Sequence, residues 1–165
     1  QQMSEARVQH NEEGKIQYYV MTGKLIFPAI NMPNFKFKKE GIWETYLVPD
    51  DSKELEVANS LGIKTKSWED IPESIYLKRW TQLKNGSSNK PVEVQNADGQ
   101  KFEFTDESGR EIVIGNNTEA KIMYHYLPIK NSYGTFHTYV LDKVKILNLV
   151  EKQDASSNLD EELDF

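Results

Sequence analysis

The sequence predicts an all-β domain, a small barrel or a sandwich, with one short helix between its early strands. Segments rich in β-branched and aromatic residues recur through residues 15–150, and Gly, Pro, Asn and Asp separate them. Apolar side chains follow helical spacing in one stretch only, between Asp51 and Gly62. A chain of 165 residues is long enough for one domain with a proper core, and its 38% apolar residues leave part of it for loops or a tail.

The first strand is expected over residues 15–27, where Pro28 ends a run of β-forming side chains. Asp51 or Ser52 caps the helix, which is about ten residues long. Gly62 stands where a C-cap belongs.

The remaining strands are expected on both sides of this helix. A terminal hairpin joins residues 120–129 to residues 135–150 through a turn at residues 131–134. The other predicted strands cover residues 41–48, 75–84, 92–95, 101–105 and 112–114.

The net charge of −6 argues at first against an anionic partner such as nucleic acid, but its distribution removes that objection. Residues 151–165 hold six acidic side chains and one lysine, which leaves −1 for the rest of the chain. Eleven lysines and arginines and 12 of the 18 aromatic residues lie in three windows that contain no acid, at residues 14–39, 74–92 and 120–141. Single-stranded nucleic acid offers phosphates to basic side chains and unstacked bases to rings, so this pattern indicates a single-strand binding surface.

Residues 75–84 carry this pattern most clearly. Strand periodicity places Tyr76, Lys78, Trp80 and Lys84 on one face, opposite a mainly apolar face. We expect this aromatic and basic face to contact DNA. The alternative is an exposed strand face whose lysines lie over Tyr76 and Trp80 and only keep the protein soluble.

Two further segments are candidates for the same surface. In the first segment rings and lysines alternate, and the residues are Phe35, Lys36, Phe37, Lys38 and Lys39. The alternative interpretation of this segment is an amphipathic strand with both phenylalanines in the core. The other offers Lys121 for phosphate and Tyr124 for stacking, although a barrel core also accepts tyrosine.

Catalytic patterns are missing from the sequence. There is no cysteine, which excludes a disulfide scaffold, thiol catalysis and Cys-ligated zinc. The three histidines lack the spacing of metal ligands, and neither a glycine-rich phosphate loop nor a nucleophile elbow occurs. No segment approaches the ~18 apolar residues of a membrane span, and none resembles a signal peptide. We therefore expect a non-enzymatic, cytoplasmic protein without cofactor or metal.

Several segments resemble the podophage-type single-stranded DNA-binding proteins. Residues 41–49 are similar to the second strand of that family, which leads into a helix. Residues 114–122, the Tyr-Leu-Pro at residues 126–128 and the strand ending at residues 147–150 are similar to its closing strands. The acidic segment that ends in Asp164 and Phe165 is similar to its C-terminal tail, in which an aromatic residue comes last.

The resemblance implies an OB-fold barrel, with a five-stranded core and extra hairpin strands, over residues 1–150 and a disordered tail over residues 151–165. It implies coating of single-stranded DNA during replication, recombination and repair of a phage genome, in the infected host cell. It also implies a tail that recruits the replication polymerase and the helicase-primase and that occupies the DNA cleft when DNA is absent. The tail and the insertion after the second strand are shorter than in the family, which leaves the partners and a homodimer open.

The chemistry of the tail supports part of this expectation independently. Six carboxylates beside a cationic groove imitate phosphates, so the tail and DNA should compete. Apolar side chains among the acids can anchor a partner protein, and the tail site comprises Leu159, Asp160, Glu161, Glu162, Leu163, Asp164 and Phe165. Two alternatives stay open: a tail that only keeps the protein soluble, and a virion or adaptor β-domain that binds protein or carbohydrate through Trp43, Tyr46 and Trp80.

Overall fold

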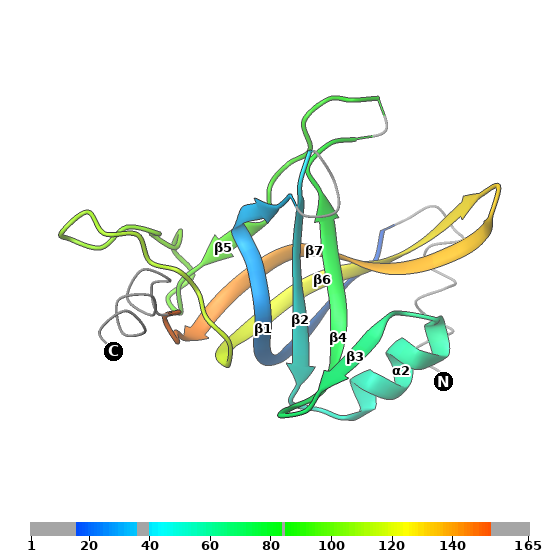
Figure 1. Ribbon diagram of the computed structural model, residues 1–165, viewed down its shortest axis with the longest axis horizontal. Coiled ribbons are helices and arrows are strands. Elements are labelled where there is room, and N and C mark those ends of the chain that lie inside the picture. Colours follow the sequence, from blue (N-terminus) through cyan, green and yellow to red (C-terminus); the bar gives the residue numbers. More distant parts are fainter. Residues whose placement is uncertain (1–15, 36–39, 84, 153–165) are drawn as a thin grey trace, which may run out of the picture.

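The strands of this protein close into a barrel (Figure 1). The computed structural model describes residues 16–35, 40–83 and 85–152. Its elements along the chain are β1 (Tyr18–Asn34), β2 (Ile42–Pro49), α2 (Lys53–Leu61), β3 (Thr65–Trp68), β4 (Ile71–Trp80), β5 (Glu93–Gln95), β6 (Thr118–Asn131) and β7 (Gly134–Asn148). Within these described ranges no helix is long and apolar enough to cross a membrane.

Five strands form the barrel wall. The sheet order is β3-β4-β2-β1-β6-β7-β5, and an additional pairing of β4 with β7 closes the ring β4-β2-β1-β6-β7. The closing pairing is parallel and short, with Leu77 opposite Tyr139 and Lys78 opposite Val140. The other pairings in the wall are antiparallel. A closed five-stranded barrel of this kind is an OB-fold, so the predicted fold is confirmed, with β3 and β5 as extra strands.

β1 is longer than the sequence predicts because a bulge carries it past Pro28. Its register against β2 shifts after Ile26. Phe27 adopts a φ of +49°, and its N–H donates to Asn116 Oδ1 at 2.7 Å. The prediction that Pro28 ends the strand is wrong, because an irregular position tolerates a residue without an N–H. The bent strand pairs with β6 along its first half and with β2 along its second half.

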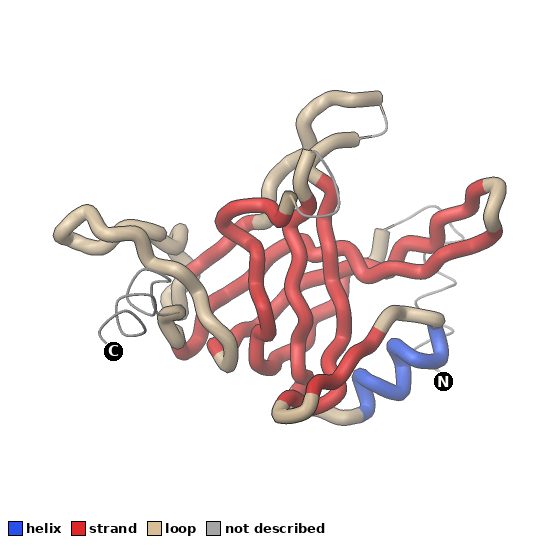
Figure 2. Tube along the Cα trace, viewed as in Figure 1, coloured by secondary structure: helices blue, strands red, loops and turns tan. Residues whose placement is uncertain are grey.

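α2 begins and ends where the sequence predicts. Asp51 Oδ1 accepts the N–H of Lys53 at 3.0 Å, and Gly62 ends the helix with a φ of +81°, which favours glycine. The helix lies at one end of the barrel beside β3 (Figure 2). It buries the side chains of Val57, Ala58 and Leu61.

The barrel interior is filled by aliphatic side chains and two tyrosine rings. Tyr124 and Tyr139 are fully buried, with ring centroids 4.6 Å apart. The fully buried aliphatic residues around them include Leu25, Leu47, Ile75, Leu77, Ile122, Leu141 and Val144.

The segment between β5 and β6 departs from the prediction of two strands. Residues 101–105 and 112–114 form isolated bridges instead. Asn96 and Asp106 each accept two backbone N–H groups with one side-chain oxygen, which builds two tight turns in place of a continuous ladder. The sequence also missed β3, whose four residues form a short strand against β4.

Candidate nucleic-acid interface

The outer face of β2 and β4 carries aromatic and charged side chains in register. Tyr46 lies opposite Tyr76, Glu44 opposite Lys78, and Ile42 opposite Trp80. The alternate residues of both strands point inward, since Thr45, Leu47, Ile75 and Leu77 are fully buried. The alternation predicted for residues 75–84 therefore holds over β4, and Tyr76, Lys78 and Trp80 share one partly buried face.

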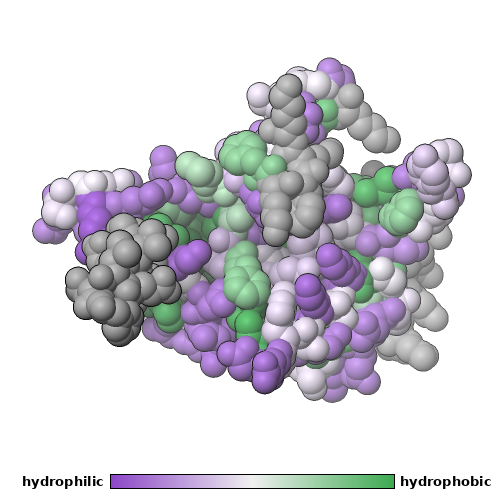
Figure 3. Space-filling view, in the orientation of Figure 1, coloured by the Kyte–Doolittle hydropathy of each residue, from purple (hydrophilic) through white to green (hydrophobic). Residues whose placement is uncertain are grey.

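Rings from four strands meet on this face. Tyr46 contacts Tyr76 and Trp68 at centroid distances of 5.0 Å each, and Phe27 contacts Trp68 at 5.2 Å. Together with Trp80 at the end of β4, these residues form what we call the stacking face: Phe27, Tyr46, Trp68, Tyr76 and Trp80. Figure 3 looks onto β1, β2 and β4 and shows apolar patches among hydrophilic atoms on this side.

Three lysines lie over the rings of the stacking face. Lys64 Nζ is 5.0 Å from the Tyr76 centroid and 5.9 Å from that of Tyr46. Lys66 Nζ is 5.2 Å from the Trp68 ring, and Lys78 Nζ is 5.0 Å from the Trp80 ring. These are cation–π distances. Cations and rings thus occupy the same surface, which is the combination that a charged, aromatic polymer needs.

Glu44 places one negative charge on this face and fixes Tyr76. The Tyr76 hydroxyl donates to Glu44 Oε1 at 2.5 Å, and Asn34 Nδ2 donates to Glu44 Oε2 at 2.7 Å. Burial raises the pKa of Tyr76 strongly, and the hydrogen bond to Glu44 and the charge of Glu44 raise it further. Tyr76 therefore stays protonated, with its ring held in one orientation.

Two hollows border the stacking face where it meets the hairpin of β6 and β7. The larger has a volume of about 570 Å³ and is lined by Trp80 and Leu83 on one side and by Leu127, Pro128 and Ile129 on the other. The smaller, of about 320 Å³, lies between Tyr76, Lys78 and the same Ile129. Ile129 lines both hollows, and we call the two hollows together, with Lys78 and Trp80, the groove. The hairpin extends well beyond the barrel (Figure 1), so the groove has a raised wall.

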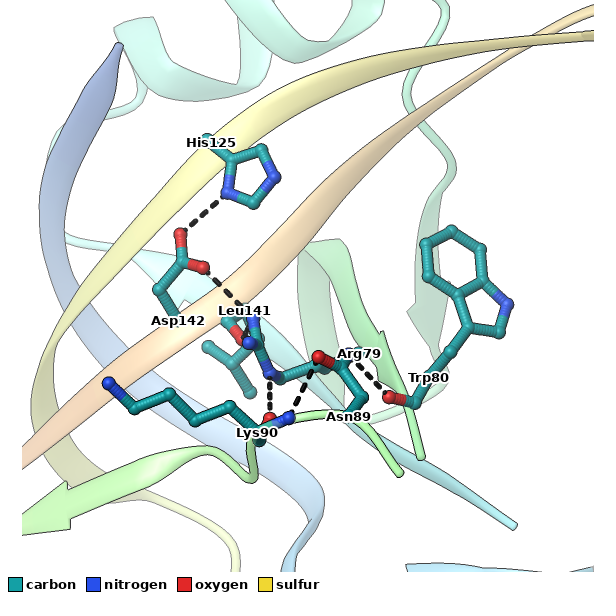
Figure 4. A network of polar contacts seen from close by, with 7 residues as sticks. All are labelled: Arg79, Trp80, Asn89, Lys90, His125, Leu141 and Asp142. Carbon is teal, nitrogen blue, oxygen red and sulfur yellow. Dashed lines mark hydrogen bonds and ion pairs between the residues drawn. The ribbon is translucent and has the colours of Figure 1, made fainter. Parts of the chain in front are cut away.

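A network of polar contacts holds the end of β4 that carries Trp80 (Figure 4). Arg79 pairs with Asp142 at 3.0 Å, and Asp142 also contacts His125 Nδ1 at 2.8 Å. Arg79 Nε donates to the Lys90 carbonyl at 2.6 Å. The carbonyl of Trp80 itself accepts Asn89 Nδ2 at 2.8 Å. Because β4 and β7 share only two paired positions, these contacts help to close the barrel and to fix Trp80.

The fold of this chain is similar to that of solved phage proteins. No family model matches the sequence, and no curated protein matches it. Among solved structures, the single-stranded DNA-binding protein gp2.5 of bacteriophage T7 matches with a TM-score of 0.60 and 15% identity, over 89% of this chain and 94% of that one. The single-stranded DNA-binding protein of bacteriophage Enc34 matches with a TM-score of 0.54 and 14% identity, over 86% and 89% of the two chains. This chain has the fold of these phage proteins.

The resemblance inferred from the sequence is thus confirmed in the fold. A structure of the Enc34 protein in complex with single-stranded DNA matches equally, with a TM-score of 0.54 and 14% identity over 83% and 88% of the two chains. In OB-folds the outer face of the second and third barrel strands is the usual binding surface. Here those strands are β2 and β4, which carry the stacking face.

The prediction that Tyr124 is a stacking platform for a base is wrong, because the structure buries this side chain. Its side chain is 0% exposed and packs against Tyr139. Tyr124 lies on the inward face of β6, between Ile122 and Tyr126, because both edges of β6 are paired and one face must fill the core. A base cannot reach this ring.

Of the other predicted DNA contacts, the structure describes two and leaves five undescribed. Lys121 is exposed on β6 but lines neither hollow. Phe35 is 55% exposed and lies close to Gly41, which lines the larger hollow. Five predicted DNA contacts, together with the tail site at residues 159–165, lie outside the described residues and stay predictions: Lys36, Phe37, Lys38, Lys39 and Lys84.

Three of the five rings of the stacking face were not among the predicted DNA contacts: Phe27, Tyr46 and Trp68. A lysine-lysine-tryptophan alternation at residues 64, 66 and 68 was available as a signal, with all three side chains on one face of a strand. Phe27 had no such signal, because it reaches the face through the bulge in β1. Trp43 is absent from the face. It alternates with Glu44, so the three residues of the protein- or carbohydrate-binding alternative, Trp43, Tyr46 and Trp80, do not share one surface.

Proposed function

We propose that this protein binds single-stranded DNA, independently of sequence, on the stacking face and in the groove. The observation that carries the proposal is that five rings, three lysines and a groove lie together on the side of the barrel formed by β1, β2, β3 and β4. The Enc34 protein, which shares this fold, has been solved with single-stranded DNA. A ring stacks on any base, which supports binding without sequence preference.

Binding uses the rings for the bases and the lysines for the phosphates. Bases stack on Trp80 and on the accessible rings beside it, at about 1–3 kcal/mol for each stacked base. Lys64, Lys66 and Lys78 move from the ring faces to the phosphates, where they release counterions. The rings favour a single strand over a duplex, because stacking on them needs unpaired bases.

We further propose that the protein acts by binding rather than by catalysis, in replication, recombination and repair of phage DNA. The acidic residues 151–165 would compete with DNA for the basic groove and recruit replication proteins. Charge supports this proposal, since residues 151–165 carry −5 of the net −6.

Titration with a fluorescently labelled oligo-dT tests the proposed function. We expect saturable binding at micromolar protein or below in low salt, with quenching of tryptophan fluorescence and release as NaCl rises. A duplex of the same length is the control and should bind more weakly. Failure to bind oligo-dT at micromolar protein in low salt would reject the proposal.

A further inference from the structure

A second pocket lies on the opposite side of β2 from the stacking face. Its volume is about 470 Å³. Trp43 reaches it from β2, Ile30 from β1, and Val94 from β5. Phe102 and Phe104, whose ring centroids are 4.9 Å apart, complete its apolar lining. We call it the distal pocket.

Backbone hydrogen bonds hold the distal pocket open. The N–H of Phe102 donates to the Val94 carbonyl at 2.9 Å, which ties the phenylalanine segment to β5. The N–H of Ile112 donates to the Phe104 carbonyl at 2.7 Å. Phe102 therefore stands on backbone tied to β5 and Phe104 on backbone tied to residue 112, so a ligand finds an apolar surface already formed.

The rim of the distal pocket is basic. Lys90 and Lys101 are exposed at its edge. Its one acidic lining residue, Glu93, is paired with Lys143 at 3.2 Å. The hydrogen bond from Lys143 lowers the pKa of Glu93, so this carboxylate is charged and already neutralised by its partner. An apolar floor with two exposed lysines at its rim suits a ligand that combines apolar and acidic side chains.

The chain leaves the described structure beside this pocket. The N–H of Gly115 donates to the Val150 carbonyl at 2.7 Å, and the N–H of Lys152 donates to the Val113 carbonyl at 2.8 Å. Val113 directly follows Ile112, which is bonded to the pocket residue Phe104. Thirteen residues, 153–165, follow Lys152. Extended, they span about 40 Å, so their last part can reach a pocket that begins this close.

We propose that the distal pocket binds residues 159–165 of the same chain once DNA fills the groove. Leu163 and Phe165 would enter the apolar floor, and the neighbouring acidic side chains would face Lys90 and Lys101. The proposal rests on the proposed function, because DNA phosphates in the groove repel the acidic segment and leave it free to dock elsewhere. Docking at the distal pocket holds that segment on the far side of β2 from the DNA.

Site-specific photocrosslinking in the full chain tests this proposal. Benzoylphenylalanine in place of Phe165 keeps an aromatic side chain, and irradiation is carried out with saturating oligo-dT. We expect crosslinks within one chain, to Trp43 or to peptides from residues 90–104. Crosslinks to β4 peptides with Tyr76 and Trp80, crosslinks to a second chain, or none at all would overturn the proposal.

A matched pair of charge reversals supplies the control. Lys90→Glu with Lys101→Glu should reduce the crosslink about fivefold or more, because two attractive contacts become repulsive. Lys24→Glu with Lys53→Glu changes two exposed lysines outside the pocket lining and should leave it unchanged. An equal yield in both variants would count against docking at this rim.

DNA affinity is measured in the same samples, so that the two proposals fail separately. Binding of oligo-dT with crosslinks elsewhere rejects only the distal pocket as a docking site. If oligo-dT does not bind, the proposed function fails, and the crosslinks formed in the free protein test the docking site. Crosslinks to residues 90–104 then support docking at the distal pocket, and their absence rejects it.

Discussion

Replacing Trp80 by alanine removes the ring that lines the larger hollow of the groove. One stacked base contributes about 1–3 kcal/mol. In the free protein Lys78 lies 5.0 Å from this ring, and giving up that contact costs about 0.5–1 kcal/mol. The net loss on substitution is therefore about 0.5–2 kcal/mol, which raises the Kd for oligo-dT about 2- to 30-fold. Trp80→Phe keeps a smaller ring and should lose less.

Fluorescence anisotropy with labelled oligo-dT at fixed low salt measures this change. Trp43→Phe is the control, because it alters a tryptophan on the other side of β2 and should change the Kd less than about twofold. The fold should survive Trp80→Ala at a cost of about 1 kcal/mol in the free energy of unfolding. The backbone carbonyl of Trp80 still accepts Asn89 in that variant. A folded Trp80→Ala protein with unchanged Kd would refute stacking at this position.

Four further predictions address charge, pH and stability. Substituting Lys64, Lys66 and Lys78 together by glutamine should lower the slope of log K against log[NaCl] by about 2, at ~0.7 for each phosphate contact on a single strand; an unchanged slope would exclude these lysines as phosphate ligands. Neutralising Asp160, Glu161, Glu162 and Asp164 as amides should tighten DNA binding at low salt, with the effect shrinking by 0.5 M as screening shortens to a few ångströms; equal or weaker binding at low salt would contradict a competing tail. Because the pKa of Tyr76 is raised in the folded protein, its contribution to stability is complete below pH 10 and falls progressively as the pH rises above 10. Urea unfolding should therefore show the free energy of unfolding falling above pH 10, more steeply in the parent protein than in Tyr76→Phe. Asp142→Asn should cost about 3 kcal/mol by leaving Arg79 without its carboxylate at the barrel closure, whereas Asp98→Asn on an exposed turn should cost little in the same urea experiment.

The sequence predicts best where the backbone is regular. The period of two along β4 places Tyr76, Lys78 and Trp80 on one face, and the structure agrees because β4 has no bulge against β2. The same period along β6 is also regular, but it cannot say which face points inward. Closure of the barrel decides that, and it buries Tyr124.

The hydrophobic pattern of the sequence does not predict the irregular parts of the barrel. Pro28 looks like the end of a strand, yet β1 pairs with β2 again from Ala29, beyond the bulge, so the missing N–H of Pro28 does not end it. Phe27 joins Trp68 on the stacking face only because β1 bulges and β3 folds back onto β4. Such contacts depend on residues about 40 positions apart, which local periodicity does not report.

The lysines over the rings have a consequence for the protein before it meets DNA. A contiguous aromatic surface exposed to water promotes self-association. Lys64, Lys66 and Lys78 cover the rings with hydrated, like-charged ammonium groups, and such groups repel a second copy of the same surface. Each ammonium group sits on a flexible four-carbon stem, so it can move from its ring to another charged group. Under the proposed function, these lysines keep the aromatic surfaces of separate molecules apart until the phosphates of DNA attract the ammonium groups.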